Sequence, residues 1–158
     1  MGEGAGWLNT RLESEGAEFL VCGLMMVEGI PTYKSYVRMP GYDLLALSSD
    51  GNRTARIQVK SRWATGSSGF IIKNFESDFV VLTLLNRGKK GGGGKVKDPE
   101  FFVIPTSSVK DASTPDSAWG KINTKKIEEF SSCRNAWHLI KAFLHPAPPP
   151  TATIEDTP

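Results

Sequence analysis

Four polar residues of this 158-residue chain have the types and positions that side-chain chemistry requires: Glu18, Asp43, Gln58 and Lys60. Glu18 interrupts an apolar segment, where a carboxylate needs a cation, a metal ion or a hydrogen-bond network as its partner. Asp43 and Gln58 offer carboxylate and amide oxygens, the ligands that hard divalent cations such as Mg²⁺ prefer. The ammonium of Lys60 is suited to steering or deprotonating a water that attacks phosphorus, or to neutralising charge that develops on the phosphate.

Two strands, predicted at 42–48 and 53–62, must bring Asp43 and Gln58 together. The Asp50-Gly51 pair between them predicts a two-residue type I′ turn, in which both central residues have positive φ. A hairpin centred on this turn has one apolar face, which we expect to be the core side. That face consists of Tyr42, Leu44, Ala46, Ala55, Ile57 and Val59.

The other face of this hairpin carries the candidate site. Asp43 lies directly opposite Gln58 in this register, with Cβ atoms about 5 Å apart. Lys60 comes one step further along the same face, and the backbone carbonyl of Val59 adds another oxygen to the set. The same spacing also fits a plain surface salt bridge from Asp43 to a neighbouring basic residue. Glu18 favours the metal site, because it adds a second acidic residue from a neighbouring helix.

Positive charge is concentrated in the middle of the chain. Residues 34–97 carry twelve Lys and Arg against four Asp and Glu, a net charge of +8, between acidic ends of −4 (1–33) and −2 (98–158). This distribution indicates a surface that faces a polyanion, although a solvated basic face without a ligand fits as well. The glycine-rich basic segment 87–97 is predicted to be a mobile loop. The candidate nucleic-acid contacts are Arg56, Arg62, Arg87, Lys89 and Lys90.

The remaining elements are predicted from apolar periodicity. A helix over 14–28, with Ser14 as its N-cap, is apolar nearly all round and should pack deep against a sheet. A second, amphipathic helix is expected over 133–144. Further strands are expected at 33–38, 70–72, 78–85 and 101–104, of which 78–85 has the continuous apolar character of a central strand.

Length and composition exclude several classes of protein. The chain is long enough for one domain, predicted over 1–145, and is followed by a Pro-rich tail at 146–158 that we expect to be disordered. The longest apolar run, 19–27, is too short to span a bilayer, and no secretory signal is evident, so a cytoplasmic protein without a membrane partner is expected. Two cysteines in apolar segments indicate buried thiols and not a zinc site.

In this order and spacing, the motifs resemble those of the PD-(D/E)xK nuclease superfamily, and in particular its archaeal Holliday-junction-resolvase-like, restriction-endonuclease-like branch. The matching segments are Gly16-Ala17-Glu18, Pro40-Gly41-Tyr42-Asp43 and Ile57-Gln58-Val59-Lys60, and the resemblance covers about residues 14–85. It implies an α/β fold with a mixed central sheet flanked by helices, in α-β-β-β-α-β order. Gln58 stands where the most common form has Glu, and Pro40 is separated from Asp43.

The resemblance implies a metal-dependent endonuclease that hydrolyses phosphodiester bonds in nucleic acid, DNA in preference to RNA. Asp43, Gln58 and the Val59 carbonyl would hold Mg²⁺, or Mn²⁺ in its place. Glu18 would act on the metal directly or through a bound water, and Lys60 would position the nucleophilic water. Members of the family often cut as homodimers, which the resemblance extends to this chain as an expectation.

Two other functions fit the same residues. The first is a non-catalytic descendant of the fold that binds nucleic acid or forms part of a larger complex, which the neutral Gln58 favours. The second is an interaction protein whose basic face docks an acidic partner and shows no preference for nucleic acid over other polyanions. Lys60 beside Asp43 favours the enzyme, since a binding module has no evident need for that carboxylate.

Overall fold

The computed structural model of the chain describes residues 3–36, 41–114 and 119–151, with side chains from Thr10 onward. Its helices are α1 (Glu3–Val27), α2 (Thr106–Asp111) and α3 (Trp137–Leu144), with 3-10 turns η1 (Thr124–Lys126) and η2 (Phe130–Cys133). Its strands are β1 (Thr32–Lys34), β2 (Leu44–Leu47), β3 (Thr54–Arg62), β4 (Gly69–Ile71), β5 (Phe79–Leu84), β6 (Glu100–Pro105) and β7 (Lys121–Asn123).

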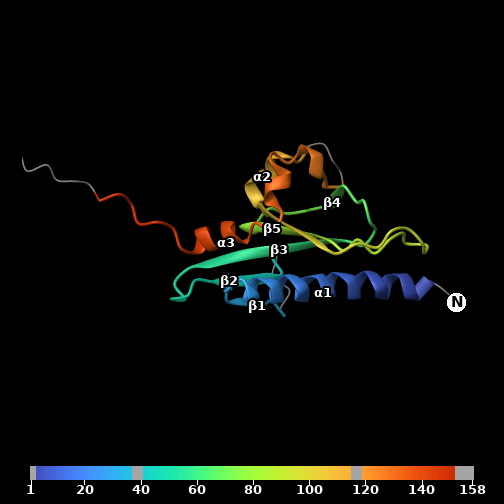
Figure 1. The fold of residues 1–158 in the computed structure, drawn as a ribbon, viewed down its shortest axis with the longest axis horizontal. Coiled ribbons are helices and arrows are strands. Elements are labelled where there is room, and N and C mark those ends of the chain that lie inside the picture. Colours follow the sequence, from blue (N-terminus) through green and yellow to red (C-terminus); the bar gives the residue numbers. More distant parts are fainter. Residues whose placement is uncertain (1–2, 37–40, 115–118, 152–158) are drawn as a thin grey trace, which may run out of the picture.

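A five-stranded mixed sheet forms the centre of the fold, in the order β1-β2-β3-β5-β6. The central pair β3 and β5 is parallel, and the other neighbours are antiparallel. A separate two-stranded sheet pairs β4 with β7. Figure 1 shows α1 along one side of the central sheet and α2 with β4 on the other.

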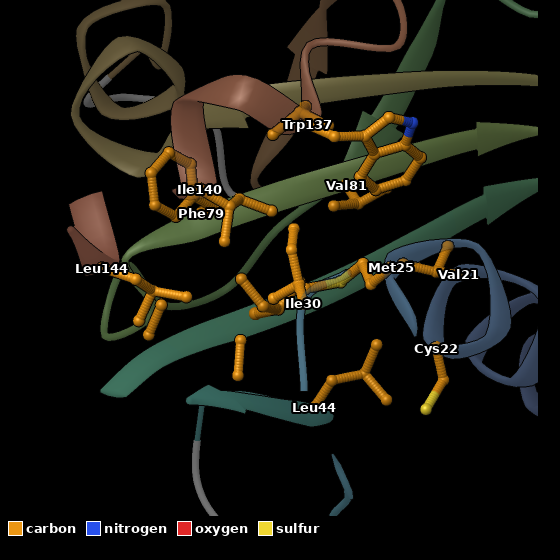
Figure 2. Packing of buried hydrophobic residues seen from close by; sticks show 14 of the residues in the cluster. Val21, Cys22, Met25, Ile30, Leu44, Phe79, Val81, Trp137, Ile140 and Leu144 are labelled. Carbon is orange, nitrogen blue, oxygen red and sulfur yellow. The ribbon is translucent and has the colours of Figure 1, made fainter. Parts of the chain in front are cut away.

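Two hydrophobic cores lie on opposite faces of the sheet, because successive side chains of a strand point to opposite faces. In β5, Phe79 and Val81 enter the core that α1 and α3 cover, whereas Val80 and Leu82 enter the core beneath α2, β4 and β7. This two-sided burial confirms the continuous apolar run predicted for a central strand. Figure 2 shows the first core, in which Trp137 of α3 approaches Val81.

The β2–β3 hairpin has the predicted register, with Leu44 opposite Ile57 and Ala46 opposite Ala55. All four of these side chains are fully buried, which confirms the predicted core face. The turn differs from the prediction. The amide of Gly51 bonds the carbonyl of Ser48 in a four-residue loop, and Gly51 alone has a positive φ there, whereas the type I′ turn required it of Asp50 too. The register is nevertheless as predicted, because the predicted turn and the observed loop are both centred on Asp50 and Gly51.

Helix α1 is longer and less buried than predicted. It begins at Glu3, so Ser14 lies inside the helix as a bonded residue rather than an N-cap, and its hydroxyl donates to the carbonyl of Thr10. Only one stripe of the helix enters the core, while Phe19 is 55% exposed and Met26 53%. The expectation of deep burial all round is therefore wrong. A helix on the outside of a single sheet has only one face to bury, however apolar its other residues are.

The crossover from β3 to the parallel strand β5 runs through residues 63–78 and contains β4, where the resemblance implies a helix. The glycines and serines of 64–69 break any helical pattern there. Helix α2 and strand β7 were not predicted. Of the predicted helix 133–144, only 137–144 forms a helix, α3, and Cys133 ends the 3-10 turn η2.

Some predictions fall on parts of the chain that the structure does not describe. Residues 37 and 38 of the predicted strand 33–38, Pro40, and residues 152–158 of the predicted tail lie outside the described residues. The described part of the tail, 146–151, is exposed and has no helix or strand. Within the described residues, no helix is both long and apolar enough to cross a membrane.

Candidate active site

Asp43 lies where β2 and β3 stop pairing. The pairing of β2 with β3 ends with Leu44 opposite Ile57, and the amide of Asp43 donates to the Ile57 carbonyl at 2.9 Å instead of pairing across from Gln58. Its carboxylate Oδ2 then accepts the amide N–H of Val59 at 2.8 Å. The predicted side-by-side ladder pair is thus replaced by a carboxylate that caps the β3 backbone between Gln58 and Lys60.

The environment of Asp43 favours its protonated form. Burial raises the pKa of the carboxyl above 3.8, and the Val59 hydrogen bond and the charge of Lys60 oppose this shift. A carboxylate that is costly to keep charged gains most when a cation is placed beside it. This is the electrostatic behaviour expected of a metal ligand.

Gln58 supplies the observation that tests whether a cation fits this site. The residue is 8% exposed, and its carbonyl oxygen Oε1 is fully buried without a hydrogen-bond partner in the protein. An unpaired buried acceptor costs about 1–3 kcal/mol, so a native structure normally satisfies it. Since a neutral amide oxygen is an ordinary ligand of Mg²⁺ and Mn²⁺, the residues present fit a hard divalent ion.

Lys60 follows Gln58 on the same face of β3, opposite the face that packs on α1. Burial lowers the pKa of its ammonium below 10.5, although the charge of Asp43 raises it, and the charge of Lys73 adds to the lowering. A lysine held in this way gives up its proton more readily than a surface lysine does. Lys60 can therefore act either as a positively charged group or, once deprotonated, as a base.

Glu18 approaches Asp43 from the α1 side, and its partner is a lysine that the sequence did not reveal. The Nζ atom of Lys34 on β1 lies 2.9 Å from Glu18 and 2.5 Å from Glu15. Burial raises the pKa of Glu18 above 4.5, the bond from Lys34 lowers it, and the negative charge of Asp43 raises it. The carboxylate predicted to need a partner thus has a cationic one. The seven-residue stretch from Pro31 to Val37 contains no pattern that would have predicted this pairing.

Gly41, two residues before Asp43, allows the β3–β5 crossover to pass close to the site. It is buried with φ +89°, and a Cβ atom there would lie 2.7 Å from Glu76 and 2.9 Å from the side-chain oxygen of Asn74. Only glycine accepts both this conformation and this contact. Asn74 and Glu76 border the site although no sequence motif contains them.

The predicted nucleic-acid contacts divide into two groups. Arg56 is engaged, since its guanidinium lies 3.4 Å from Asp78. Arg62 is exposed at the end of β3, and Arg87, Lys89 and Lys90 are exposed in the segment 87–97. This segment, expected to be mobile, has internal structure: the Lys89 amide bonds Gly93, and the Thr65 hydroxyl donates to the Lys95 carbonyl.

The donor set for a metal is therefore small. Among the described residues, no group of three or more His, Cys, Asp and Glu is arranged to hold a metal ion. The set that fits consists of one carboxylate (Asp43), one amide oxygen (Gln58) and backbone carbonyl oxygen. Such a set carries a single negative charge and suits an ion that keeps several waters.

The mixed sheet with β3 and β5 parallel at its centre, α1 on one face and Asp43 at the β2–β3 divergence together define a restriction-endonuclease-like α/β fold. A solved structure has the same fold. The chain is similar to a bacterial homing endonuclease, I-Ssp6803I, with a TM-score of 0.56 and 20% sequence identity over 85% of this chain and 93% of that one. This similarity confirms the predicted fold class. No protein-family model and no curated protein matches the sequence.

Proposed function

We propose that this protein is a metal-dependent endonuclease of the PD-(D/E)xK type that hydrolyses phosphodiester bonds in DNA. One observation carries the proposal: the Asp43 carboxylate is bonded to the β3 backbone between Gln58, whose buried Oε1 is unpaired, and Lys60, whose pKa is lowered. The homing endonuclease of similar fold supports DNA as the substrate.

Each of the three residues has a distinct part in the proposed reaction. Asp43 and Gln58, with the Val59 carbonyl, would hold Mg²⁺ or Mn²⁺. When bound, such an ion supplies Lewis-acid polarisation of the phosphodiester and a water of lowered pKa. Lys60 orients the attacking water and offsets negative charge that develops on the phosphate, which its position beside Asp43 allows.

The basic surface would hold the DNA backbone. Arg62, Arg87, Lys89 and Lys90 are exposed, and none of them has an ion pair among those found in the described residues. Arg56 belongs to this surface with one side of its guanidinium already bound to Asp78. Contacts of this kind fix the position of a duplex without reading its sequence.

Cleavage of a panel of substrates tests the proposal. Plasmid, single strands, a four-way junction and RNA are incubated with Mg²⁺ or Mn²⁺, and wild type is compared with Asp43→Ala and Lys60→Ala. We expect cutting that requires the metal and falls by about 10²-fold or more in each variant. The four-way junction tests the resolvase-like branch, and RNA tests the preference for DNA.

The alternative function is a non-catalytic nucleic-acid-binding or complex-forming module on the same fold. The observation that favours it is the neutral Gln58, which leaves Asp43 as the one carboxylate in the donor set. Intact substrates, with binding that is indifferent to both substitutions, would establish this alternative. Light scattering of the protein with and without DNA measures the homodimer, which stays a prediction, as does a cytoplasmic location.

A further inference from the structure

Trp119 is a large aromatic side chain that lies in solvent. It is 78% exposed, and none of the ring–ring and cation–π contacts found among the described residues involves it. By contrast, the exposed rings of Phe19 and Tyr36 both contact the ammonium of Lys34. Exposed tryptophans are enriched where a protein binds a partner, because the indole gains most when another surface covers it.

The backbone at Trp119 is held in a fixed position. Strands β4 and β7 pair through Ile71 and Lys121, and beyond them the amide of Ile72 donates to the carbonyl of Gly120 at 2.9 Å. Gly120 has φ +63°, and a Cβ atom there would overlap the carbonyl oxygen of Ile72, so only glycine fits. Trp119 therefore leaves the small sheet from a position that the backbone determines.

This end of the small sheet adjoins the candidate active site. Trp119 and Lys73 are the next residues beyond the last backbone bond between the two strands, so both lie at the same end of the sheet. The charge of Lys73 acts on the ammonium of Lys60. The next residue of the crossover, Asn74, borders Gly41 beside the site. The exposed indole thus lies at the edge of the proposed DNA-cleaving centre.

The surroundings of Trp119 are basic. Lys121 follows it by two residues, Lys73 lies at the same end of the sheet, and both are exposed. An aromatic face beside ammonium groups is the combination that binds unpaired nucleic acid, in which bases stack on the ring and phosphates contact the cations. The same lysines disfavour an apolar protein partner, which would bury their charges without a counter-ion.

We propose that Trp119 stacks on an unpaired base of the DNA beside the candidate active site, while Lys73 contacts the adjoining phosphate. The inference rests on the proposed function and adds a substrate class to it, namely DNA with unpaired bases next to the cleavage position. In an intact duplex both faces of each base are covered by its neighbours, so an indole can stack only after the bases are separated. A single strand offers a free base face without that cost.

Equilibrium binding in EDTA tests this assignment without reference to cleavage. Fluorescence anisotropy is measured with a labelled single strand and with the corresponding duplex. Trp119→Ala should weaken binding of the single strand by at least about fivefold, and Trp119→Phe, which keeps a ring, should bind at least about twofold more tightly than Trp119→Ala. Neither variant should change the slope of log affinity against log salt, whereas Lys73→Gln should flatten it by about 0.7. Trp119→Ala should bind the duplex within about twofold of wild type, because its paired bases have no free face.

The fluorescence of Trp119 provides a second readout, one that a purely structural role would not change. Stacking on a base quenches an indole, so a saturating single strand should quench the tryptophan emission of wild type more than that of Trp119→Phe. Phe19→Ala is the matched control, because it removes another exposed ring, from α1 on the opposite face of the sheet. This control should keep the wild-type affinity for the single strand within about twofold.

Failure of the inference is distinguishable from failure of the proposed function. A loss below fivefold on the single strand, an equal loss on the duplex or in Phe19→Ala, or equal quenching in wild type and Trp119→Phe overturns the stacking role. Metal-dependent cleavage by the same protein would leave the nuclease proposal standing and would assign the exposed indole to a protein partner. The expected loss and quenching without cleavage by any metal would overturn the enzyme alone. Wild type that binds neither DNA overturns both.

Discussion

Gln58 sets the charge of the candidate site. As an amide it offers an oxygen atom without a second negative charge beside Asp43, and its buried Oε1 has no partner in the protein. A glutamate at this position would have the same shape but would bring a buried charge next to a carboxylate whose pKa is already raised. Under the proposed function, an amide at this position would bind the metal less tightly than a carboxylate but would keep the metal-free protein more stable.

Replacing Gln58 by Glu should reveal both effects, on stability without metal and on stabilisation by the metal. Without metal, the buried carboxylate is expected to lower the free energy of unfolding by at least about 1–3 kcal/mol, the usual cost of an unsatisfied buried polar group. Mn²⁺ should then raise the melting temperature more in Gln58→Glu than in wild type, because the ion gains a second charged ligand. Thermal melts in EDTA and in Mn²⁺ measure both effects. An equal shift by Mn²⁺ in the two proteins would show that Gln58 does not face the ion.

The raised pKa of Asp43 predicts a pH-dependent stability in EDTA. The folded state holds the proton of this carboxyl more tightly than the unfolded chain, whose pKa is about 3.8. The stability that Asp43 contributes is therefore complete below pH 3.8 and is lost as the pH rises through the raised pKa of the folded state. Asp43→Asn, whose amide oxygen can still accept the Val59 N–H, should melt above wild type at pH 7. This advantage should shrink towards pH 4, and an advantage independent of pH would contradict the shift.

At the scale of elements, α1 is held by a single stripe of side chains. Met25 is fully buried in the core that Figure 2 shows, while the next residue, Met26, is 53% exposed. We expect Met25→Ala to lower the free energy of unfolding by about 2–5 kcal/mol, through lost contacts and the cavity left behind. Met26→Ala, the same chemical change one residue away, should stay within about 0.5 kcal/mol. Urea unfolding measures both, and similar losses would contradict the one-sided packing of α1.

The hairpin shows why the sequence predicted the register of β2 and β3 better than it predicted the helices. The alternation along β2 and β3 has only one register that buries Leu44 and Ile57 together, so the pairing followed from the residues alone. Apolar residues all round α1 could not show that its far side has no neighbour. At the end of the ladder, the amide of Asp43 donates to the Ile57 carbonyl and its carboxylate accepts the Val59 N–H, and the residue types alone do not predict these two bonds.

Contacts between residues that lie far apart in the chain could not be predicted from the sequence for a related reason. Glu18 visibly required a partner, but the choice of Lys34 follows from β1 lying beside β2 at the edge of the sheet. The approach of Asn74 to Gly41 likewise depends on a crossover that the family pattern predicts as a helix. Local patterns therefore predicted that Asp43 lies near Gln58 and Lys60, while the positions of the residues around them depend on the whole topology.

For the whole molecule, the two faces of the sheet have different tasks. One carries the core under α1 and α3 and the ion pairs of Lys34 with Glu15 and Glu18, and the other carries the core under α2, β4 and β7 together with Gln58 and Lys60. The basic segment 87–97 is joined to the end of β3 through Thr65, whose amide bonds the carbonyl of Gly88. Figure 1 shows this segment reaching past the sheet at the same end as the first turns of α1. We therefore expect a DNA duplex bound at the candidate site to contact the exposed lysines of the segment 87–97.

The salt dependence of DNA binding tests whether the segment 87–97 contacts the duplex. A variant with Lys89, Lys90, Lys95 and Lys97 all changed to Gln removes four exposed charges from the segment. Each phosphate contact contributes about 0.9 to the slope of log affinity against log salt, so loss of several contacts should flatten this slope by about 2–4 and weaken binding by at least about tenfold near 0.1 M salt. Fluorescence anisotropy of a labelled duplex in EDTA measures both quantities without cleavage.

The matched control removes the same charge from elsewhere on the surface, at four further exposed lysines: Lys110, Lys125, Lys126 and Lys141. If the segment 87–97 lies on the DNA, this control should keep the wild-type slope and an affinity within about twofold, because its charges lie too far from the duplex to release counterions. Equal weakening by the two variants would mean that net charge alone attracts the nucleic acid. Unchanged binding in the segment variant would place the duplex away from 87–97 and leave Arg62 as the nearest exposed cation on β3.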